Sequence, residues 1–238
     1  QKYPNLRSLH QTCEEGQVVN SVIVRGPDGP LKSAIQRRLA SLPPISDKDE
    51  NDIEIGVGTE AQDLSILKYE QERNNGSPCI ILKDVVTDVE DNFWSDGLFH
   101  SVIRDGISGK SDSGYPSNPR YWLPVENVAD AIRTLVSSNV YPSSSKPILM
   151  TGRRPWRCEA LLMEASHLWA RFQASNLGEH SPETLSEPPL HLSDKTDVTV
   201  RPDLSELNDL MLSCGEPYGW RPSGSLRLSI MRVFATLV

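Results

Sequence analysis

The 238-residue sequence has no run of about 18 apolar residues, so nothing in it predicts a membrane-spanning helix. It also lacks an apolar segment behind its first residues, and we expect no signal peptide there. The four cysteines lie far apart without any C-x-x-C pair, which predicts neither a zinc site nor a disulfide framework. Buried free thiols in a reducing compartment, with the cytoplasm as the default, are the simplest interpretation.

Long basic stripes are missing as well. The formal net charge is −8, and binding to a nucleic-acid backbone requires clustered lysine and arginine, so nucleic acid is not an expected partner. The five histidines form no H-x-x-x-H pair, and we expect no metal site. No Gly-x-Ser-x-Gly elbow indicates a serine hydrolase.

Apolar runs instead alternate between strand-like and helix-like patterns. The sequence predicts strands over residues 18–24, 79–82 and 147–150. It predicts helices over residues 5–15, 31–42, 64–74, about 94–104, 157–174, 204–212 and 226–238. Residues 46–52, 109–119 and 176–197 are predicted to be loops. This alternation favours an α/β protein with a parallel sheet.

The most informative stretch runs from Arg120 to Val136. A short apolar strand ends in Pro-Val, and Glu126 and Asn127 follow where a helix N-terminus favours an anion or a cap. Apolar residues then recur at helical spacing. The segment therefore predicts a strand that leads directly into an amphipathic helix.

This segment resembles the Arg-x-Phe-x-x-Val-x-Asp-Val-Ala-x-Ala motif of the extended short-chain dehydrogenases/reductases, the family of sugar-nucleotide epimerases and dehydratases. Three other segments follow the family's order. Residues 5–24 are similar to the helix and strand before its catalytic serine, and residues 65–83 to its active-site helix and next strand. Residues 201–226, with Gly-Trp-Arg-Pro at 219–222, resemble its ending. The resemblance implies an NAD(P)-dependent enzyme acting on a sugar nucleotide or a small alcohol or ketone.

The resemblance also implies site residues. Lys68 would be the catalytic, cofactor-binding lysine of the Tyr-x-x-x-Lys motif, and Arg120 and Arg201 would bind substrate. However, the residue four positions before Lys68 is Leu64, which has no proton to transfer. Tyr69 would point about 100° away from Lys68 on a helix, so it is a poor replacement.

The Gly26-Pro-Asp-Gly29 turn has two possible interpretations. It follows a strand and precedes a helix, as a dinucleotide-binding turn does, but the third glycine is Lys32. Pro27 and Pro30 also remove backbone donors that phosphate needs. We therefore favour a proline-rich turn, and we assign residues 18–24 to the fifth strand of the family's sheet. The cofactor-binding half would then be absent from the chain.

A second local pattern is the basic cluster Arg153-Arg154-Pro-Trp-Arg157. It predicts either the solvated start of a helix or a site for an anionic ligand. Cations gain nothing from the dipole of a helix N-terminus, so the solvated start is favoured.

The fold prediction is an α/β protein with a partial Rossmann-like, doubly wound parallel sheet and a small C-terminal subdomain of the substrate-binding type. Residues 1–83, with 120–150, would form the core, and residues 84–119 and 151–238 the subdomain.

Three functions stay open. The first is the NAD(P)-dependent enzyme. The second is a degenerate family member or fragment that binds no cofactor by itself and serves as a binding or assembly module, with a protein partner or a missing N-terminal segment. The third is a carrier-protein thioester reductase, because residues 122–126 also resemble that subgroup, although the Gly-Trp-Arg-Pro ending argues against it. No membrane contact is expected in any of the three.

Overall fold

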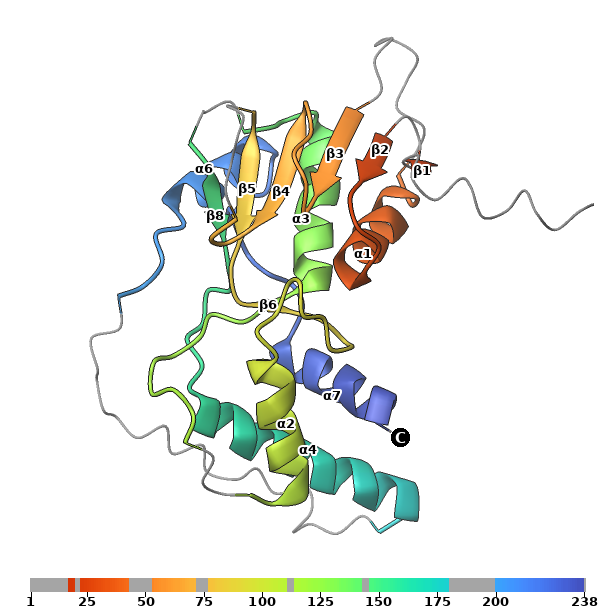
Figure 1. The fold of residues 1–238 in the computed structure, drawn as a ribbon, viewed down its shortest axis with the longest axis vertical. Helices are drawn as coiled ribbons and strands as arrows, with labels where there is room; N and C mark the ends of the chain where they lie inside the picture. The colour runs from red at the N-terminus through yellow and green to blue at the C-terminus, as the bar shows by residue number, and fades with distance from the viewer. Residues whose placement is uncertain are drawn as a thin grey trace, which may run out of the picture.

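The computed structural model describes residues 17–19, 22–42, 53–71, 77–110, 114–142, 146–179 and 200–237. One part of the molecule contains a six-stranded sheet, and the other contains the helices α2, α4 and α7 (Figure 1). The strands lie in the order β1 (Gln17–Val19), β2 (Val22–Arg25), β3 (Ile53–Val57), β4 (Leu64–Lys68), β5 (Cys79–Leu82) and β8 (Ile148–Met150). β1 pairs antiparallel with β2, and all other neighbours are parallel. The predicted α/β class with a Rossmann-like parallel sheet is confirmed.

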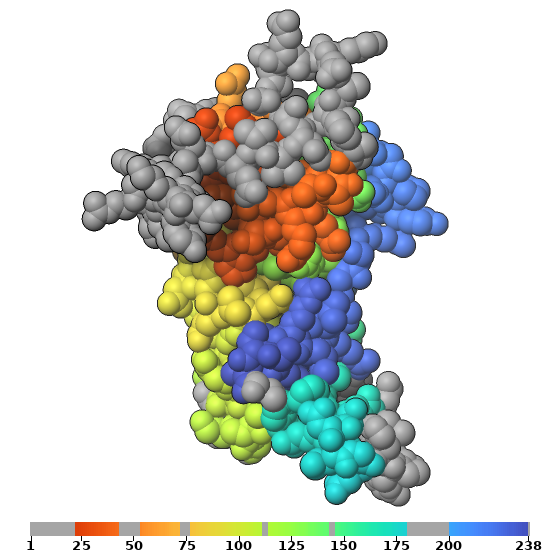
Figure 2. Space-filling view, turned by 90° about the vertical axis from the view of Figure 1, so that its right-hand side faces the viewer, coloured from red at the N-terminus to blue at the C-terminus, as the bar shows by residue number. Residues whose placement is uncertain are grey.

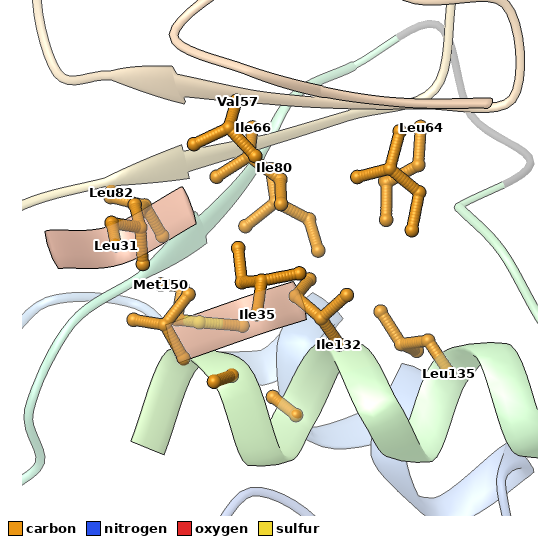
Figure 3. Close-up of a cluster of buried hydrophobic side chains, with 14 of the residues drawn as sticks. Leu31, Ile35, Val57, Leu64, Ile66, Ile80, Leu82, Ile132, Leu135 and Met150 are labelled. Carbon is orange, nitrogen blue, oxygen red and sulfur yellow. The ribbon is translucent and has the colours of Figure 1, made fainter. Parts of the chain in front are cut away.

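The main core lies between this sheet and three helices, α1 (Pro30–Leu39), α3 (Val125–Ser138) and α6 (Ser205–Ser213). The strand register places alternate residues of neighbouring strands in one row, which pairs Val24 with Ile55 and Ile66 with Ile80. All four side chains belong to one buried cluster. Figure 3 shows Ile66 and Ile80 in this cluster with Ile35 of α1 and Ile132 of α3. Alternation along strands and helical spacing along α1 and α3 therefore direct both sets of apolar side chains to the same layer.

β3 and β4 are parallel although only residues 58–63 connect them. Parallel neighbours usually require a much longer crossover. Here the connection folds back against β3, where a Cβ on Gly56 would collide with the carbonyl oxygen of Thr59. Asp63 Oδ2 accepts a hydrogen bond from Glu54 N (2.8 Å), and Ser65 Oγ accepts one from Ala61 N (3.0 Å). A loop thus takes the place of a crossover helix.

The predicted helix over residues 64–74 is wrong, because its first half is strand β4. Residues on both faces of β4 are buried, including Leu64 and Ile66 on one face and Ser65 and Leu67 on the other. A strand covered on both sides has no polar alternation, so its apolar run matches a helical pattern equally well. The correction moves Lys68 from a helix to the end of a strand.

The second part of the molecule has its own apolar cluster, built from α2 (Leu98–Ser108), α4 (Cys158–Leu177) and α7 (Leu226–Leu237). α2 and α4 approach closely at Gly106, where a Cβ would lie 2.7 Å from the carbonyl oxygen of Leu162. A two-stranded ladder of β6 (Val85–Val86) and β7 (Leu123–Pro124) joins the two parts. Figure 2 shows α7 on the surface between the sheet part and α4.

Most other element predictions are confirmed. Helices occur where the sequence predicts them over residues 31–42, 157–174, 204–212 and 226–238, and strands where it predicts them over 79–82 and 147–150, with ends shifted by a few residues. The helix predicted at about 94–104 begins at Leu98, because Asp91 forms a turn before it by accepting a hydrogen bond from Phe93 N (2.8 Å). The predicted helix 5–15, the loop 46–52 and most of 176–197 lie outside the described residues.

β3 was missed by the sequence analysis. Its residues Ile53, Ile55 and Val57 alternate with Glu54 and Gly56, which is the pattern of a short strand. Residues 18–24 also differ from the single strand that was predicted, since the structure shows β1 and β2 as an antiparallel pair.

His100 on α2 is a buried titratable group, with only 5% of its surface exposed and its ring edge-on to Phe99. Burial lowers the pKa of His100, while the carboxylate of Glu90 acts in the opposite direction. The folded protein therefore holds this side chain neutral at a pH where the unfolded chain already binds a proton.

We expect the free energy of unfolding to fall as the pH drops below about 6.5 and this contribution to level off below the lowered pKa of His100. Urea unfolding of the wild type and of His100→Leu between about pH 7.5 and 5 measures the effect. The variant should lose less stability over this interval than the wild type. Parallel losses in the two proteins would contradict the assignment.

Candidate functional site

The carboxyl ends of β2 and β3 meet at the turn Gly26–Gly29. Gly26 has a φ of 117°, and a Cβ there would collide with the carbonyl oxygen of Val57 at the end of β3, so glycine is required. Helix α1 begins directly after Gly29. The arrangement of strand, glycine turn and helix is the one that binds a pyrophosphate in dinucleotide-binding folds.

The observed sheet differs from the one that the assignment of residues 18–24 to the family's fifth strand predicts, because four more parallel strands follow β2. β2 is the first parallel strand in the described chain and has its own crossover through α1 to β3. Only about 40 residues separate the glycine turn from Lys68, which from the sequence alone is too few for a helical crossover before each of the intervening strands. The six-residue connection between β3 and β4 removes that objection.

Lys32 occupies the position of the third glycine and folds back over the turn. Only 9% of its surface is exposed, and its ammonium group donates to Gly26 O (2.8 Å) and to Asp28 Oδ1 (3.0 Å). The long side chain therefore fills space that a glycine would leave open, and its charge is used inside the turn.

Asp91 lies beside the start of α1. A Cβ on Gly29 would be 3.5 Å from Asp91 Oδ2, and the other carboxylate oxygen accepts hydrogen bonds from Phe93 N and Trp94 N. A negative charge at a helix N-terminus is favourable by itself, and it opposes a second anion there. Because Pro27 and Pro30 also lack N–H donors, the residues of the turn do not fit a pyrophosphate group.

A cavity of about 400 Å³ opens at the carboxyl ends of β4 and β5. Its lining includes Lys68 and Arg120, so the structure brings together two residues that the sequence singled out in separate motifs. Lys83 also lines it, with Nζ 4.6 Å from the centroid of the Tyr69 ring. Leu64 lies at the other end of β4, fully buried in the core, so it takes no part in this cavity. We call this the Lys68 cavity.

Arg120 is held by two carboxylates. Its guanidinium donates to Asp84 Oδ1 (3.0 Å) and to Asp96 Oδ2 (2.8 Å). Burial acts to lower the pKa of Arg120, but the hydrogen bond with Asp84 and the charges of Asp96 and Asp84 outweigh it and raise the pKa. The positive charge of Arg120 is thus balanced within the protein.

Arg201 lines another cavity, of about 450 Å³, together with Arg153, Asn208 and Trp220. This cavity is distinct from the Lys68 cavity, although Tyr121 on its wall is the direct neighbour of Arg120. The structure therefore groups Arg120 with Lys68 and groups Arg201 with the basic cluster that follows β8.

The largest of these cavities, about 650 Å³, lies where the segment after β8 meets the segment between α6 and α7. We call it the arginine cavity, because four arginines line it: Arg153, Arg154, Arg221 and Arg227. The sequence analysis noted the first two in a local cluster. It could not place the other two beside them, because they follow about 70 residues later in the chain.

Two residues that line the Lys68 cavity were missed although a signal was present. Lys83 and Asp84 follow β5 directly, and charged residues at the carboxyl end of a buried parallel strand commonly line a ligand crevice. Asp84 is 3% exposed at its side chain and has a φ of 55°.

No protein-family model matches the sequence, and no curated protein matches it. Among solved structures, the chain is similar to the Bordetella bronchiseptica enzyme WbmF in complex with NADH, with 10% identity and a TM-score of 0.44 over 87% of this chain. It is also similar to the terminal R domain from the myxalamid PKS-NRPS biosynthetic pathway, with 13% identity and a TM-score of 0.38 over 91% of this chain. The chain spans 64% of the WbmF chain and 68% of the R domain.

In the part of the chain that the structure describes, no helix combines the length and apolar character that crossing a bilayer requires. Within the same residues, histidine, cysteine and acidic side chains form no group of three or more that could hold a metal ion.

Replacing Asp84 tests how Arg120 is held. Asp84→Asn should lower the free energy of unfolding by roughly 1.5–3 kcal/mol, because it removes the charge and replaces with an NH2 donor one of the two oxygens that accept from Arg120 and from the backbone N–H of Tyr121. The matched control Asp96→Asn removes the other carboxylate, whose side chain is 49% exposed, and should cost less than about 1 kcal/mol. Urea unfolding of both variants gives the comparison, and equal losses would refute the central role of Asp84.

Proposed function

We propose that this protein is a catalytically degenerate member of the NAD(P)-dependent epimerase, dehydratase and reductase type that serves as a binding module. It keeps the α/β scaffold and the glycine turn, but the turn is closed by its own side chains. The observation that carries the proposal is the pair Lys32 and Asp91, which bring charged groups to the start of α1.

Both charged groups disfavour phosphate binding at the turn. The ammonium group of Lys32 is already hydrogen-bonded to Gly26 O and Asp28, and the Asp91 carboxylate adds a negative charge beside Gly29. A phosphate approaching this turn meets an anion and finds two prolines where it needs N–H donors. The ammonium group of Lys32 is thus used within the turn, and the Asp91 carboxylate opposes an incoming phosphate.

The proton-transfer residues support the same proposal. The position four before Lys68 is a leucine buried in the core, so a tyrosine–lysine pair of the usual spacing does not exist here. Tyr69 is exposed and lies under the Lys83 ammonium group, but it follows Lys68 on an extended strand end rather than on a helix.

A second candidate is an active NAD(P)-dependent enzyme acting on a sugar nucleotide or a small alcohol or ketone. The grouping of Lys68, Lys83 and Arg120 in one cavity at the carboxyl edge of the sheet favours it. In that case Lys68 contacts the cofactor, and Arg120 and Arg201 contact the substrate. The hypothesis of a carrier-protein thioester reductase is supported by the resemblance of residues 122–126 alone.

We also propose that the chain divides into a sheet part and a substrate-type part. The two apolar clusters support two parts. Helix α6, however, contributes Leu207, Leu210 and Met211 to the cluster under the sheet, so we group residues 200–220 with the sheet part.

Calorimetric titration with NAD(H) and NADP(H) separates the two candidates. We expect no binding at the glycine turn at cofactor concentrations up to about 1 mM, and Lys68→Ala should leave the heats unchanged. A micromolar dissociation constant that Lys68→Ala weakens would establish the active enzyme instead.

The double variant Lys32→Gly/Asp91→Asn provides the opposite test. It restores the third glycine and removes the negative charge, so it should bind NADH at least about tenfold more tightly than the wild type. Unchanged binding in this variant would show that the two side chains do not close the turn.

A further inference from the structure

We propose that the arginine cavity is a binding site for a small phosphorylated molecule, separate from the Lys68 cavity. This inference rests on the proposed binding function and names the site and the class of ligand. No part of the glycine turn and neither of the residues Lys68 and Arg120 lines this cavity.

The size and construction of the cavity suit a small ligand. Its volume of about 650 Å³ falls in the range of ordinary ligand pockets, roughly 300–1,000 Å³. One wall comes from residues 152–156, between β8 and α4, and the facing wall from residues 221–227, between α6 and α7. Trp122 and Asn127 connect the two walls.

The arginine side chains give the cavity a positive charge that the described carboxylates offset only in part. Arg153 donates to the carbonyl oxygen of Trp220 (3.1 Å), and Arg154 and Arg221 stack over the rings of Trp156 and Tyr218. Among the residues described, no carboxylate forms an ion pair with any of these three arginines. Arg227 differs, because it pairs with the buried Glu164.

Three guanidinium groups around one cavity, none of them paired with a carboxylate among the described residues, are unfavourable without a ligand because like charges repel. This cluster of positive charge contrasts with the rest of the protein, since the whole chain carries a net charge of −8. A phosphate group, with two or more ionised oxygens, matches the planar fork of arginine and would relieve this repulsion.

The facing wall is held in place. Asn127 Oδ1 accepts a hydrogen bond from Gly224 N (2.6 Å), and a Cβ on Gly224 would lie 2.7 Å from that oxygen. Ser225 precedes α7, and its hydroxyl oxygen accepts from Arg227 N (3.2 Å). The N-terminus of this 12-residue helix adds a partial positive charge to that of the arginines.

Aromatic side chains supply the apolar lining. Trp122 is buried at one wall, and its Nε1 has no hydrogen-bond partner among the described residues. Trp156 lines the cavity beside Arg154. Flat apolar walls next to guanidinium groups suit a phosphate ester that carries a ring, so we choose AMP as the ring-bearing probe and adenosine as its uncharged counterpart.

Calorimetry with inorganic pyrophosphate, AMP and adenosine tests the site. The wild-type protein should bind pyrophosphate and AMP with dissociation constants below about 1 mM and bind adenosine at least about tenfold more weakly. Absence of pyrophosphate and AMP binding at about 10 mM, or equal binding of AMP and adenosine, would overturn the proposal.

Variants locate the binding. Arg154→Gln and Arg221→Gln should each weaken pyrophosphate binding by about tenfold, because each removes one guanidinium contact to the anion. Arg104→Gln, which removes one positive charge from the surface pair with Glu90, is the matched control and should change the affinity by less than about twofold. Thermal unfolding of each variant checks that it folds.

Equal losses in all three variants would mean general attraction of anions and would overturn the site. Loss of pyrophosphate binding in Lys68→Ala, with Arg154→Gln and Arg221→Gln unchanged, would place the anion in the Lys68 cavity and overturn it as well. Failure of the proposed function has another signature, namely micromolar dinucleotide binding that depends on Lys68, so the two outcomes are distinguishable.

Discussion

The buried carboxylate of Asp84 is the interaction on which the arrangement of both cavities depends. It lies just after β5, accepts hydrogen bonds from Arg120 and from the backbone of Tyr121, and its own carbonyl accepts one from Leu123 N. The segment so fixed begins β7 and leads into α3. The same segment pairs with the chain after β8, through Gly152 N to Tyr121 O and through the bridge between Arg120 and Trp156. One acidic side chain therefore aligns three stretches of chain, and the Lys68 and arginine cavities lie where these stretches meet.

Local patterns in the sequence were sufficient for helices with one apolar face and for some short apolar runs bounded by turns. Helix α3 was predicted because its apolar residues recur at helical spacing, and β5 because a short apolar run follows a turn. β4 could not be identified in this way, since both of its faces are buried and its run lacks alternation. The tight connection before it also made the chain seem too short for the order of strands that it adopts. The sequence alone also could not predict contacts between distant residues, such as Arg120 and Asp84, which are 36 positions apart.

Charged residues oppose anion binding at one place in this fold and favour it at another. At the glycine turn, the Lys32 ammonium group donates to Gly26 O and Asp28, and the Asp91 carboxylate places a negative charge beside Gly29, so an external phosphate is disfavoured there. In the arginine cavity, Arg154 and Arg221 are supported by aromatic rings rather than carboxylates, so their capacity to bind an anion is retained. The sequence shows both sets of charges, but only the arrangement in space distinguishes a neutralised charge from an available one. Motif matching alone therefore points to the turn, while the electrostatics point to the arginine cavity.

Trp122 links the two cavities, because it lines both the Lys68 cavity and the arginine cavity. It also packs edge-on against Phe99 in the second apolar cluster. Its position follows from the residues beside it, with Arg120 and Tyr121 held by Asp84 and Leu123 paired in the β6–β7 ladder. A wall shared by two cavities and anchored in a packed cluster cannot be reshaped for one cavity without affecting the other. The paired charge of Arg120 on one side of this wall, and on the other the three arginines without an ion-pair partner in the described part of the chain, are thus two results of the same backbone arrangement. The rigid wall at Trp122 therefore supports the proposed site in the arginine cavity whether or not the glycine turn binds a ligand.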